Sequence, residues 1–295
     1  VYEITADEDV ITPDGTLRYH KGDVVDTVTT NEDGKAKSKE LYLGKYTVVE
    51  TKAPNGMVIN KEKHSVELTY AGQDVAVTET ATSFVNERQK VKISLEKVLE
   101  QNETFGIGKN DKIKNISFGL YAKEDIVSSS GTVIPADGLI EIITLDENGT
   151  ATANTDLPFG SYYIKEIATD EHYILSDTQY PFTFEYAGQD TETVEIKVND
   201  GKPIENKLIY GSVSGKKIDE NGEALGGALI GIFKADETEY TKEHAIMTAT
   251  SEKDGSFSFA KVPYGKWIVR EIEAPEGFVL DDTSYEVNIG ENEQV

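Results

Sequence analysis

Side chains that commonly bind metals or attack substrates are few and scattered in this sequence. It contains no cysteine, and its histidines, His20, His64, His172 and His244, lack the spacing of metal ligands. The segment Asp219–Gly222 begins like a calcium loop, but the remaining ligands of that pattern are missing. Paired carboxylates are common in so acidic a chain and do not indicate a glycosidase. We therefore expect no metal, no cofactor and no enzyme that turns over a substrate.

One carboxylate differs from the others because it recurs within an internal repeat. The repeated pattern is a glycine, any residue, an aromatic residue, three residues and a glutamate. It occurs at Gly44–Glu50, Gly160–Glu166 and Gly265–Glu271. Repeats at long, nearly equal intervals indicate a chain built from similar modules. A glutamate kept at one place in every module is the first candidate for chemistry.

Other segments repeat in the same register. A turn signal precedes each copy, at Asn31–Gly34, Asp146–Gly149 and Glu252–Gly255. Such Asp-Gly and Asn-Gly sequences between alternating segments predict hairpin turns. Farther along, Tyr70–Asp74 returns unchanged as Tyr186–Asp190. Several matches at one offset establish the repeat.

The segment after the glutamate distinguishes the middle copy. The first and third copies continue with Ala-Pro-x-Gly, at Ala53–Gly56 and Ala274–Gly277. The middle copy instead has Thr169, Asp170 and His172 in place of the alanine, proline and glycine. We expect this difference to alter the shape of the loop.

Strands are the elements that must position these residues. Tyr46–Val49, Tyr162–Ile164 and Trp267–Val269 are β-branched and aromatic, as strand residues often are. Ser256–Phe259 alternates with a period of two residues, the pattern of a half-buried strand. Many short strands with regularly spaced turns predict tandem all-β, immunoglobulin-like sandwich modules.

The repeat places three modules at residues 1–88, 89–208 and 209–295. The middle module has an opening strand, Val91–Lys97, and a closing strand, Ile204–Leu208. The third module opens in the same way at Ser212–Asp219. In this register the first module lacks its opening strand, and the third module lacks its closing strand.

Charge and hydropathy exclude two classes of partner. With 29 basic and 54 acidic residues, the chain has a formal charge of −25, which repels nucleic acid. No stretch approaches the roughly 20 apolar residues of a membrane-spanning helix, so we expect no membrane contact in this segment. The absence of cysteine also means that any covalent reinforcement must come from another reaction.

The opening lysine strand, the Tyr-x-x-x-Glu-x-x-Ala-Pro-x-Gly segment and the closing strand with asparagine have a precedent. Together they resemble the collagen-adhesin B-type (CnaB) repeats and the SpaA-like pilin modules of Gram-positive surface proteins. The resemblance implies a prealbumin-like sandwich and an extracellular, cell-wall-attached stalk or shaft of an adhesin or pilin. Its partners would be the neighbouring modules of the same protein.

Many modules of that family form a spontaneous bond between a lysine and an asparagine, with a glutamate assisting. By position in the middle module, the resemblance assigns these roles to Lys97, Asn206 and Glu166. Burial lowers the pKa of a lysine and so favours the nucleophilic amine. Burial also favours a protonated glutamate, which could polarise the asparagine carbonyl and shuttle protons while ammonia leaves.

The outer modules each lack one member of this set. The first module offers Glu50 and Asn86 without a lysine, and the third offers Lys217 and Glu271 without an asparagine. We expect no bond in either. For the middle module, the alternative is that Lys97 is an ordinary strand lysine on a solvated face.

A second function remains open from the sequence, namely a module that binds a host matrix protein or a glycan. Such a surface should expose an apolar or aromatic patch. The segments Asp7–Asp23 and Gln101–Asn115 are the candidate loops, although neither is rich in aromatic residues.

Overall fold

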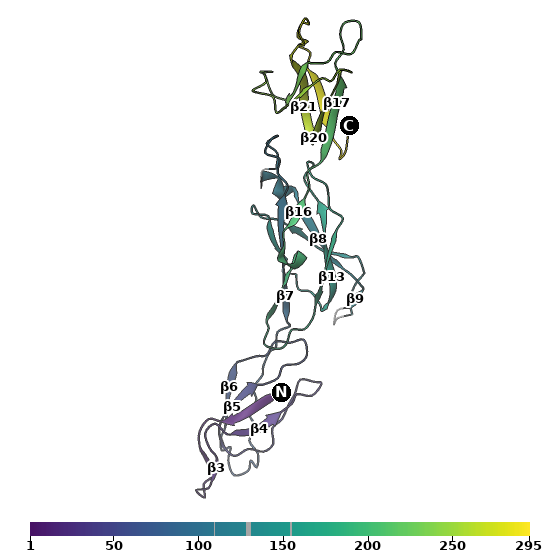
Figure 1. The fold of residues 1–295 in the computed structure, drawn as a ribbon. Coiled ribbons are helices and arrows are strands. Elements are labelled where there is room, and N and C mark those ends of the chain that lie inside the picture. Colours follow the sequence, from purple (N-terminus) through teal and green to yellow (C-terminus); the bar gives the residue numbers. More distant parts are fainter. Residues whose placement is uncertain (109, 128–130, 154) are drawn as a thin grey trace. The chain divides into compact units, whose positions relative to one another are not determined.

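The computed structural model describes residues 1–108, 110–127, 131–153 and 155–295, and it is built from strands. Within these ranges the helical segments are two short 3-10 turns, η1 (Asn110–Asn115) and η2 (Val198–Gly201). None of the helices in the described part is long and apolar enough to cross a membrane. The predicted all-β class is confirmed (Figure 1).

The first set of strands forms one antiparallel sheet and a small hairpin. The sheet has the order β4-β1-β5-β6, and β2 pairs with β3. Alternating side chains of this sheet enclose a core that includes the fully buried Tyr46. The strands are β1 (Tyr2–Ala6), β2 (Val10–Ile11), β3 (Leu17–Tyr19), β4 (Val24–Val28), β5 (Gly44–Glu50) and β6 (Lys63–Leu68).

The middle set forms two main sheets, of order β11-β8-β13-β14 and β12-β7-β15, with β16 paired to β7 and a small β9–β10 hairpin. This is the arrangement of a sandwich. The strands are β7 (Lys90–Leu99), β8 (Ser117–Ala122), β9 (Ile126–Val127), β10 (Val133–Ile134), β11 (Leu139–Thr144), β12 (Thr150–Ala153), β13 (Gly160–Ala168), β14 (Gln179–Phe184), β15 (Thr193–Lys197) and β16 (Ile204–Asn206).

The last set repeats this plan with fewer strands. Its sheets have the orders β19-β18-β21-β22 and β17-β20. Among the described residues, β17 therefore lacks the neighbours that β15 and β16 give to β7. The strands are β17 (Tyr210–Lys216), β18 (Leu229–Lys234), β19 (Met247–Thr250), β20 (Ser256–Pro263), β21 (Gly265–Glu273) and β22 (Tyr285–Ile289).

Contacts between residues divide the chain into two compact units. One comprises Val1–Lys92, Thr155–Phe159 and Phe184–Glu195, and the rest of the described chain forms the other. The first unit thus contains the first set of strands together with short pieces of the middle set. The module boundaries after residues 88 and 208 stay predictions.

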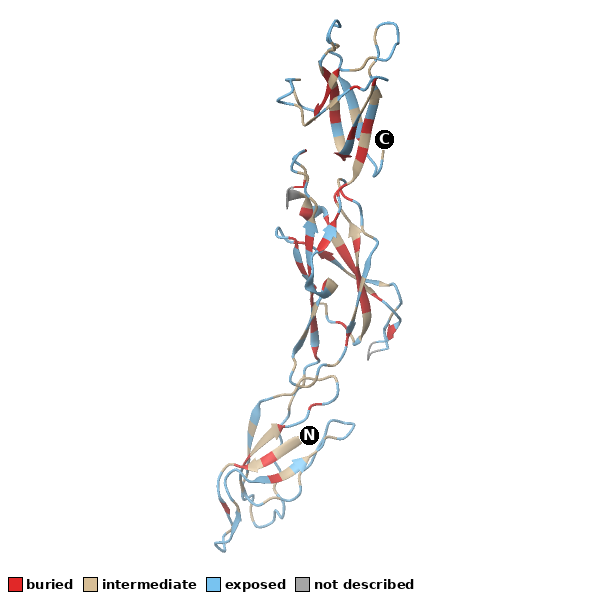
Figure 2. Cartoon of the chain, in the orientation of Figure 1, coloured by how far each residue is buried: buried red, intermediate tan, exposed pale blue. Residues whose placement is uncertain are grey.

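Buried residues alternate along the strands, as Figure 2 shows. The core around β17 to β22 also contains a residue from outside that set, Phe105, whose ring meets Trp267 edge-on at a centroid distance of 4.8 Å. Phe105 lies in the loop after β7 and is buried. Residue 109 of the segment Gln101–Asn115 lies outside the described residues. The aromatic residue of this segment, Phe105, packs in a core and is not exposed for binding.

The turn signals form tight turns, but the prediction that they close hairpins is wrong for all three. The turn at Asn31–Gly34 lies between β4 and β5, which belong to one sheet but are separated there by β1. Gly149 and Gly255 donate backbone hydrogen bonds to Asp146 and Glu252, which closes each turn. The strands on either side, however, belong to different sheets. A tight turn reverses the chain in either case, and side-chain burial on both flanking strands decides whether it joins one sheet or two.

Candidate functional site

Each repeated glutamate lies in an inner strand of a four-stranded sheet, on the buried face. Glu50, Glu166 and Glu271 occupy β5, β13 and β21 and are all buried. Their cross-strand neighbours are Tyr2 and Phe118 for the first two, and Ile230 for the third. The pairing of β13 with β8 and of β21 with β18 shifts register directly after the glutamate. Such a bulge redirects the side chains that follow it.

Lys97 reaches the core because it continues an alternating pattern. On β7, Val91, Ile93 and Leu95 are buried in alternate positions, and Lys97 is next in the same register. The side chain therefore points inward beside Phe118. This alternation is visible in the sequence and argues against a solvated lysine.

Strand β16 brings Asn206 to this lysine. It runs parallel to β7, with Ile204 opposite Lys97 and Asn206 opposite Leu99. The strands that open and close the middle module are thus direct neighbours. Lys97, Glu166 and Asn206 are each only 1 % exposed.

The three side chains are in mutual contact. The Lys97 Nζ donates a hydrogen bond to the Asn206 Oδ1 at 2.5 Å and lies 3.3 Å from the Glu166 Oε1. The Asn206 Nδ2 donates to the Glu166 Oε1 at 2.8 Å and to the Oε2 at 2.9 Å. The carboxylate therefore bridges the amine and the amide nitrogen, while the amine adjoins the amide carbonyl.

This orientation differs in one respect from the chemistry expected from sequence. The expected role of Glu166 included polarising the Asn206 carbonyl. In the structure the Glu166 oxygens contact the amide nitrogen, and it is Lys97 that contacts the carbonyl oxygen. Glu166 thus contacts both the Lys97 amine and the Asn206 amide nitrogen, a position from which a carboxylate can transfer protons.

The surroundings favour a neutral amine. Burial lowers the pKa of Lys97, and the nearby Glu166 carboxylate opposes this shift only in part. Glu166 is itself held by the backbone N–H of Ser176, which donates to its Oε2 at 2.9 Å. Burial, followed by the Glu166 charge, raises the pKa of Tyr180 nearby. A buried amine whose pKa is lowered and which lies beside a carbonyl is the arrangement that favours nucleophilic attack.

The first module contains half of this arrangement. The Asn86 Nδ2 donates to the Glu50 Oε2 at 2.7 Å, as does the backbone N–H of Asn60 at 2.7 Å. The other carboxylate oxygen, Glu50 Oε1, is buried and has no hydrogen-bond partner. It corresponds to the oxygen that faces Lys97 in the middle module.

The third module contains the opposite half. The Lys217 Nζ lies 3.3 Å from the Glu271 Oε2, and the backbone N–H of Asp281 donates to the same oxygen at 2.7 Å. Lys217 is more accessible than Lys97, with 15 % of its side chain exposed, and also lies 3.8 Å from Asp281. The Glu271 Oε1 is buried without a partner.

Sequence reasoning missed two contributors. Ser176 follows Glu166 by the same interval as Asn60 follows Glu50 and Asp281 follows Glu271, so the repeat itself could have identified this backbone donor. The other is Thr169, whose Oγ1 accepts a hydrogen bond from the Asn206 Nδ2 at 2.9 Å. Thr169 was visible only as a departure from Ala-Pro-x-Gly.

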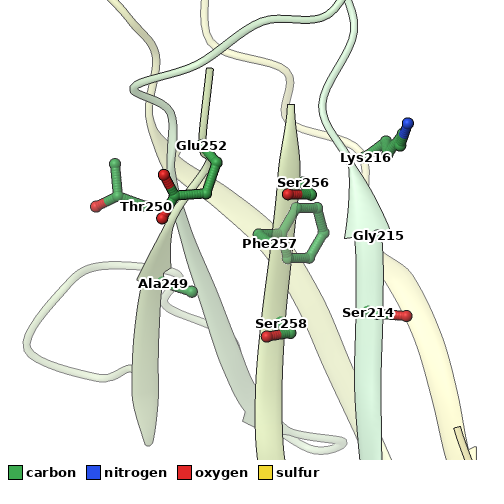
Figure 3. A pocket seen from close by; sticks show the side chains of 9 residues that line it. All are labelled: Ser214, Gly215, Lys216, Ala249, Thr250, Glu252, Ser256, Phe257 and Ser258. Atoms are coloured by element: carbon green, nitrogen blue, oxygen red, sulfur yellow. The ribbon is translucent and has the colours of Figure 1, made fainter. Parts of the chain in front are cut away.

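Other candidate sites contribute no comparable set. Among the described residues no cluster could hold a metal ion, and Asp219 forms a turn by accepting hydrogen bonds from the backbone of Asn221 and Glu223. A shallow groove lies along β17, β19 and β20. Figure 3 shows its Phe257 ring beside Gly215 and its Lys216 pointing away from the other lining side chains. We assign no chemistry to this groove.

Comparisons with known proteins agree with the architecture. The family model for the SpaA prealbumin-like fold domain matches residues 10–82, 103–202 and 211–295. A solved structure, the Bacillus anthracis TIE protein, covers 100 % of this chain and 46 % of its own, with a TM-score of 0.65 and 22 % identity. That likeness concerns the fold.

Two curated proteins are similar in sequence. The trypsin-resistant surface T6 protein of Streptococcus pyogenes serotype M6 is 29 % identical over 139 residues, which are 46 % of this chain and 24 % of that protein. Colossin-A of Dictyostelium discoideum is 24 % identical over 290 residues, 91 % of this chain and 2 % of that protein. The chain thus spans only a small part of either relative.

Proposed function

The chain belongs to the family of SpaA prealbumin-like fold domains, and from that premise we propose that it is a structural section of a bacterial surface stalk. In this proposal the middle module is closed by an amide bond between Lys97 and Asn206. The observation that carries the proposal is the buried contact of Lys97, Asn206 and Glu166. Similarity to a streptococcal surface protein supports an extracellular, cell-wall location.

The reaction follows from the atoms in contact. The neutral Lys97 amine attacks the Asn206 Cγ, and the bond between Cγ and Nδ2 breaks. Glu166 accepts a proton from the attacking nitrogen and gives it to Nδ2, so that ammonia leaves. The products are one amide bond and one ammonia, and Glu166 ends as it began. The fold supplies the orientation that makes this single turnover possible.

The bond would serve the stalk mechanically. It joins β7 to β16, the strands that open and close the middle module, and encloses nearly all of it in a covalent loop. Such a loop restricts the unfolded chain as a disulfide does. Force applied at the ends of the module would then load a covalent bond in a protein that has no cysteine.

The test is the intact mass of the purified chain and of the Glu166→Ala variant. We expect the wild-type chain to be lighter than its sequence by one ammonia and the variant to have its full mass, apart from the substitution. Glu50→Ala, which changes the equivalent residue of the first module, is the matched control and should still lose one ammonia. A full wild-type mass would refute the bond.

A further inference from the structure

The Asn206 amide nitrogen is held from two directions. It carries two hydrogens. Glu166 accepts from it with both carboxylate oxygens, and the Thr169 Oγ1 accepts from it at 2.9 Å. With one hydrogen directed at the carboxylate and the other at the hydroxyl, the amide cannot rotate without losing both partners. Its carbonyl oxygen consequently stays against Lys97.

The internal repeat shows that this hydroxyl is peculiar to the middle module. The residue three positions after the glutamate is Ala53 in the first module and Ala274 in the third. In the first module the Asn86 amide nitrogen donates instead to the backbone carbonyl of Val58, at 2.9 Å. The complete set of reacting residues thus coincides with a hydroxyl where the other modules have a methyl group.

The Thr169 hydroxyl has a stronger donor to accept from as the reaction proceeds. When Glu166 passes a proton to Nδ2, the single lone pair of that nitrogen is used, and Nδ2 becomes a positively charged group that only donates. Hydrogen bonds from a charged donor are stronger than those from a neutral one. The Thr169 Oγ1 therefore stabilises the transition state more than the ground state, and that difference accelerates a reaction.

The loop that carries Thr169 is fixed at its next residue. Asp170 is buried, and its Oδ2 accepts a hydrogen bond from the Asn115 Nδ2 at 2.7 Å. The His172 Nδ1 lies 2.6 Å from the Asp170 Oδ1. Asp170 and His172 are the substitutions that distinguish this loop from Ala-Pro-x-Gly. They anchor the backbone so that the hydroxyl is positioned before the reaction begins.

From this geometry we infer that Thr169 is a catalytic residue of the bond-forming reaction, in contact with the departing nitrogen of Asn206. The inference rests on the proposed function. Its hydroxyl orients the amide toward Lys97 and continues to accept a hydrogen bond from Nδ2 as Glu166 protonates that nitrogen. The anchored loop of Asp170 and His172 is the device that holds it there.

The test compares rates of ammonia loss in newly made full-length chains. Each chain is produced by pulsed cell-free synthesis, and the fraction that has lost ammonia is followed by intact mass over time. Thr169→Val, which keeps the shape and removes the hydroxyl, should react about fivefold to tenfold more slowly, the effect of one hydrogen bond. Thr169→Ser, which keeps the hydroxyl, should stay within about twofold of wild type.

The possible outcomes separate the two proposals. A valine variant as fast as wild type, or a serine variant as slow as the valine variant, would overturn the role of the hydroxyl while leaving the bond intact. No loss of ammonia in any chain, wild type included, would refute the bond and this inference with it. Should the valine variant fail to fold, Thr169→Ala, the residue of the other two modules, carries the same expectation.

Discussion

The repeated glutamate has different contacts in the middle module and in the two outer modules. Glu166 has partners on both carboxylate oxygens, whereas Glu50 and Glu271 each keep one buried oxygen without a partner. All three follow the same strand register and receive the same backbone hydrogen bond. The sheet therefore positions the carboxylate, and the strands at the two ends of the middle module supply Lys97 and Asn206, the pair that reacts in our proposal.

The comparison shows where the energetic cost lies. A buried polar atom without a partner costs about 1–3 kcal/mol. The first module bears this cost at the Glu50 Oε1, and the third bears it at the Glu271 Oε1, because Lys217 contacts the other oxygen of that carboxylate. The middle module avoids it and, in our proposal, replaces the contact with a covalent bond.

The largest effect should come from removing the bond. Asn206→Ala prevents it and opens a loop whose ends are 109 residues apart. For a loop on the order of 100 residues, chain entropy alone predicts a loss of about 5 kcal/mol. Chemical unfolding of the middle module measures this. Asn86→Ala in the first module is the matched control and should cost only about 1–2 kcal/mol, and equal losses would contradict the account.

A smaller effect should follow from the residue that the third core takes from the loop after β7. Phe105→Ala removes a buried ring from against Trp267 and should lower the free energy of unfolding of that core by about 3–5 kcal/mol. Phe278→Ala, at a half-exposed aromatic residue of the same module, should change it far less. Thermal unfolding followed by Trp267 fluorescence would measure both. An unchanged transition in Phe105→Ala would show that the two sets of strands are independent.

The rate of bond formation should depend on pH through Lys97. Burial lowers the pKa of Lys97 from its ordinary value of 10.5, so the neutral amine accumulates as pH rises through that lowered pKa. Below it, the rate of ammonia loss should rise about tenfold per pH unit, and above it the rate should level off, before pH 10.5 is reached. Newly synthesised chains transferred to different pH values would provide the profile. A rate that still climbs at the ordinary lysine pKa would mean that Lys97 is not desolvated before reaction.

The smallest effect is expected at the half-site of the first module. Glu50→Gln keeps an oxygen for Asn60 and Asn86 and removes a carboxylate oxygen that has no partner. Both donors keep an acceptor, and the side-chain amide nitrogen takes the place of an oxygen that had no partner. The free energy of unfolding should therefore change by less than about 1 kcal/mol. Glu166→Gln, measured by the same urea titration, should cost several times more because it also prevents the bond. Similar losses in the two variants would contradict the claim that Glu166 contributes more to stability than Glu50 because it forms the bond.

Much of the fold was predictable because each copy of the repeat consists of short sequence patterns that mark its own strands and turns. The glutamate strands, their shared register and the neighbouring opening and closing strands follow from alternation and from matched offsets. The burial of Lys97 was also implied, since Val91, Ile93 and Leu95 precede it in alternate positions. Residues whose role is fixed by strand register are within reach of sequence reasoning.

The parts that were not predicted depend on loops. Thr169 meets Asn206 only because a bulge and the anchored Asp170 turn the loop after β13 inward. Phe105 enters a core of a later set of strands, and no periodic pattern marks a single loop residue for that role. The turn at Asp146–Gly149 has the same local chemistry whether it joins one sheet or two.

Peptide mapping would locate the bond between Lys97 and Asn206 directly. Loss of ammonia alone is not specific, because the Asn-Gly pairs at Asn55, Asn148 and Asn221 can also lose ammonia by cyclising to succinimides. Digestion of the denatured chain, followed by tandem mass spectrometry, should yield one branched peptide that joins the Lys97 segment to the Asn206 segment. Separate, unmodified Lys97 and Asn206 peptides from a fully folded chain would contradict the account.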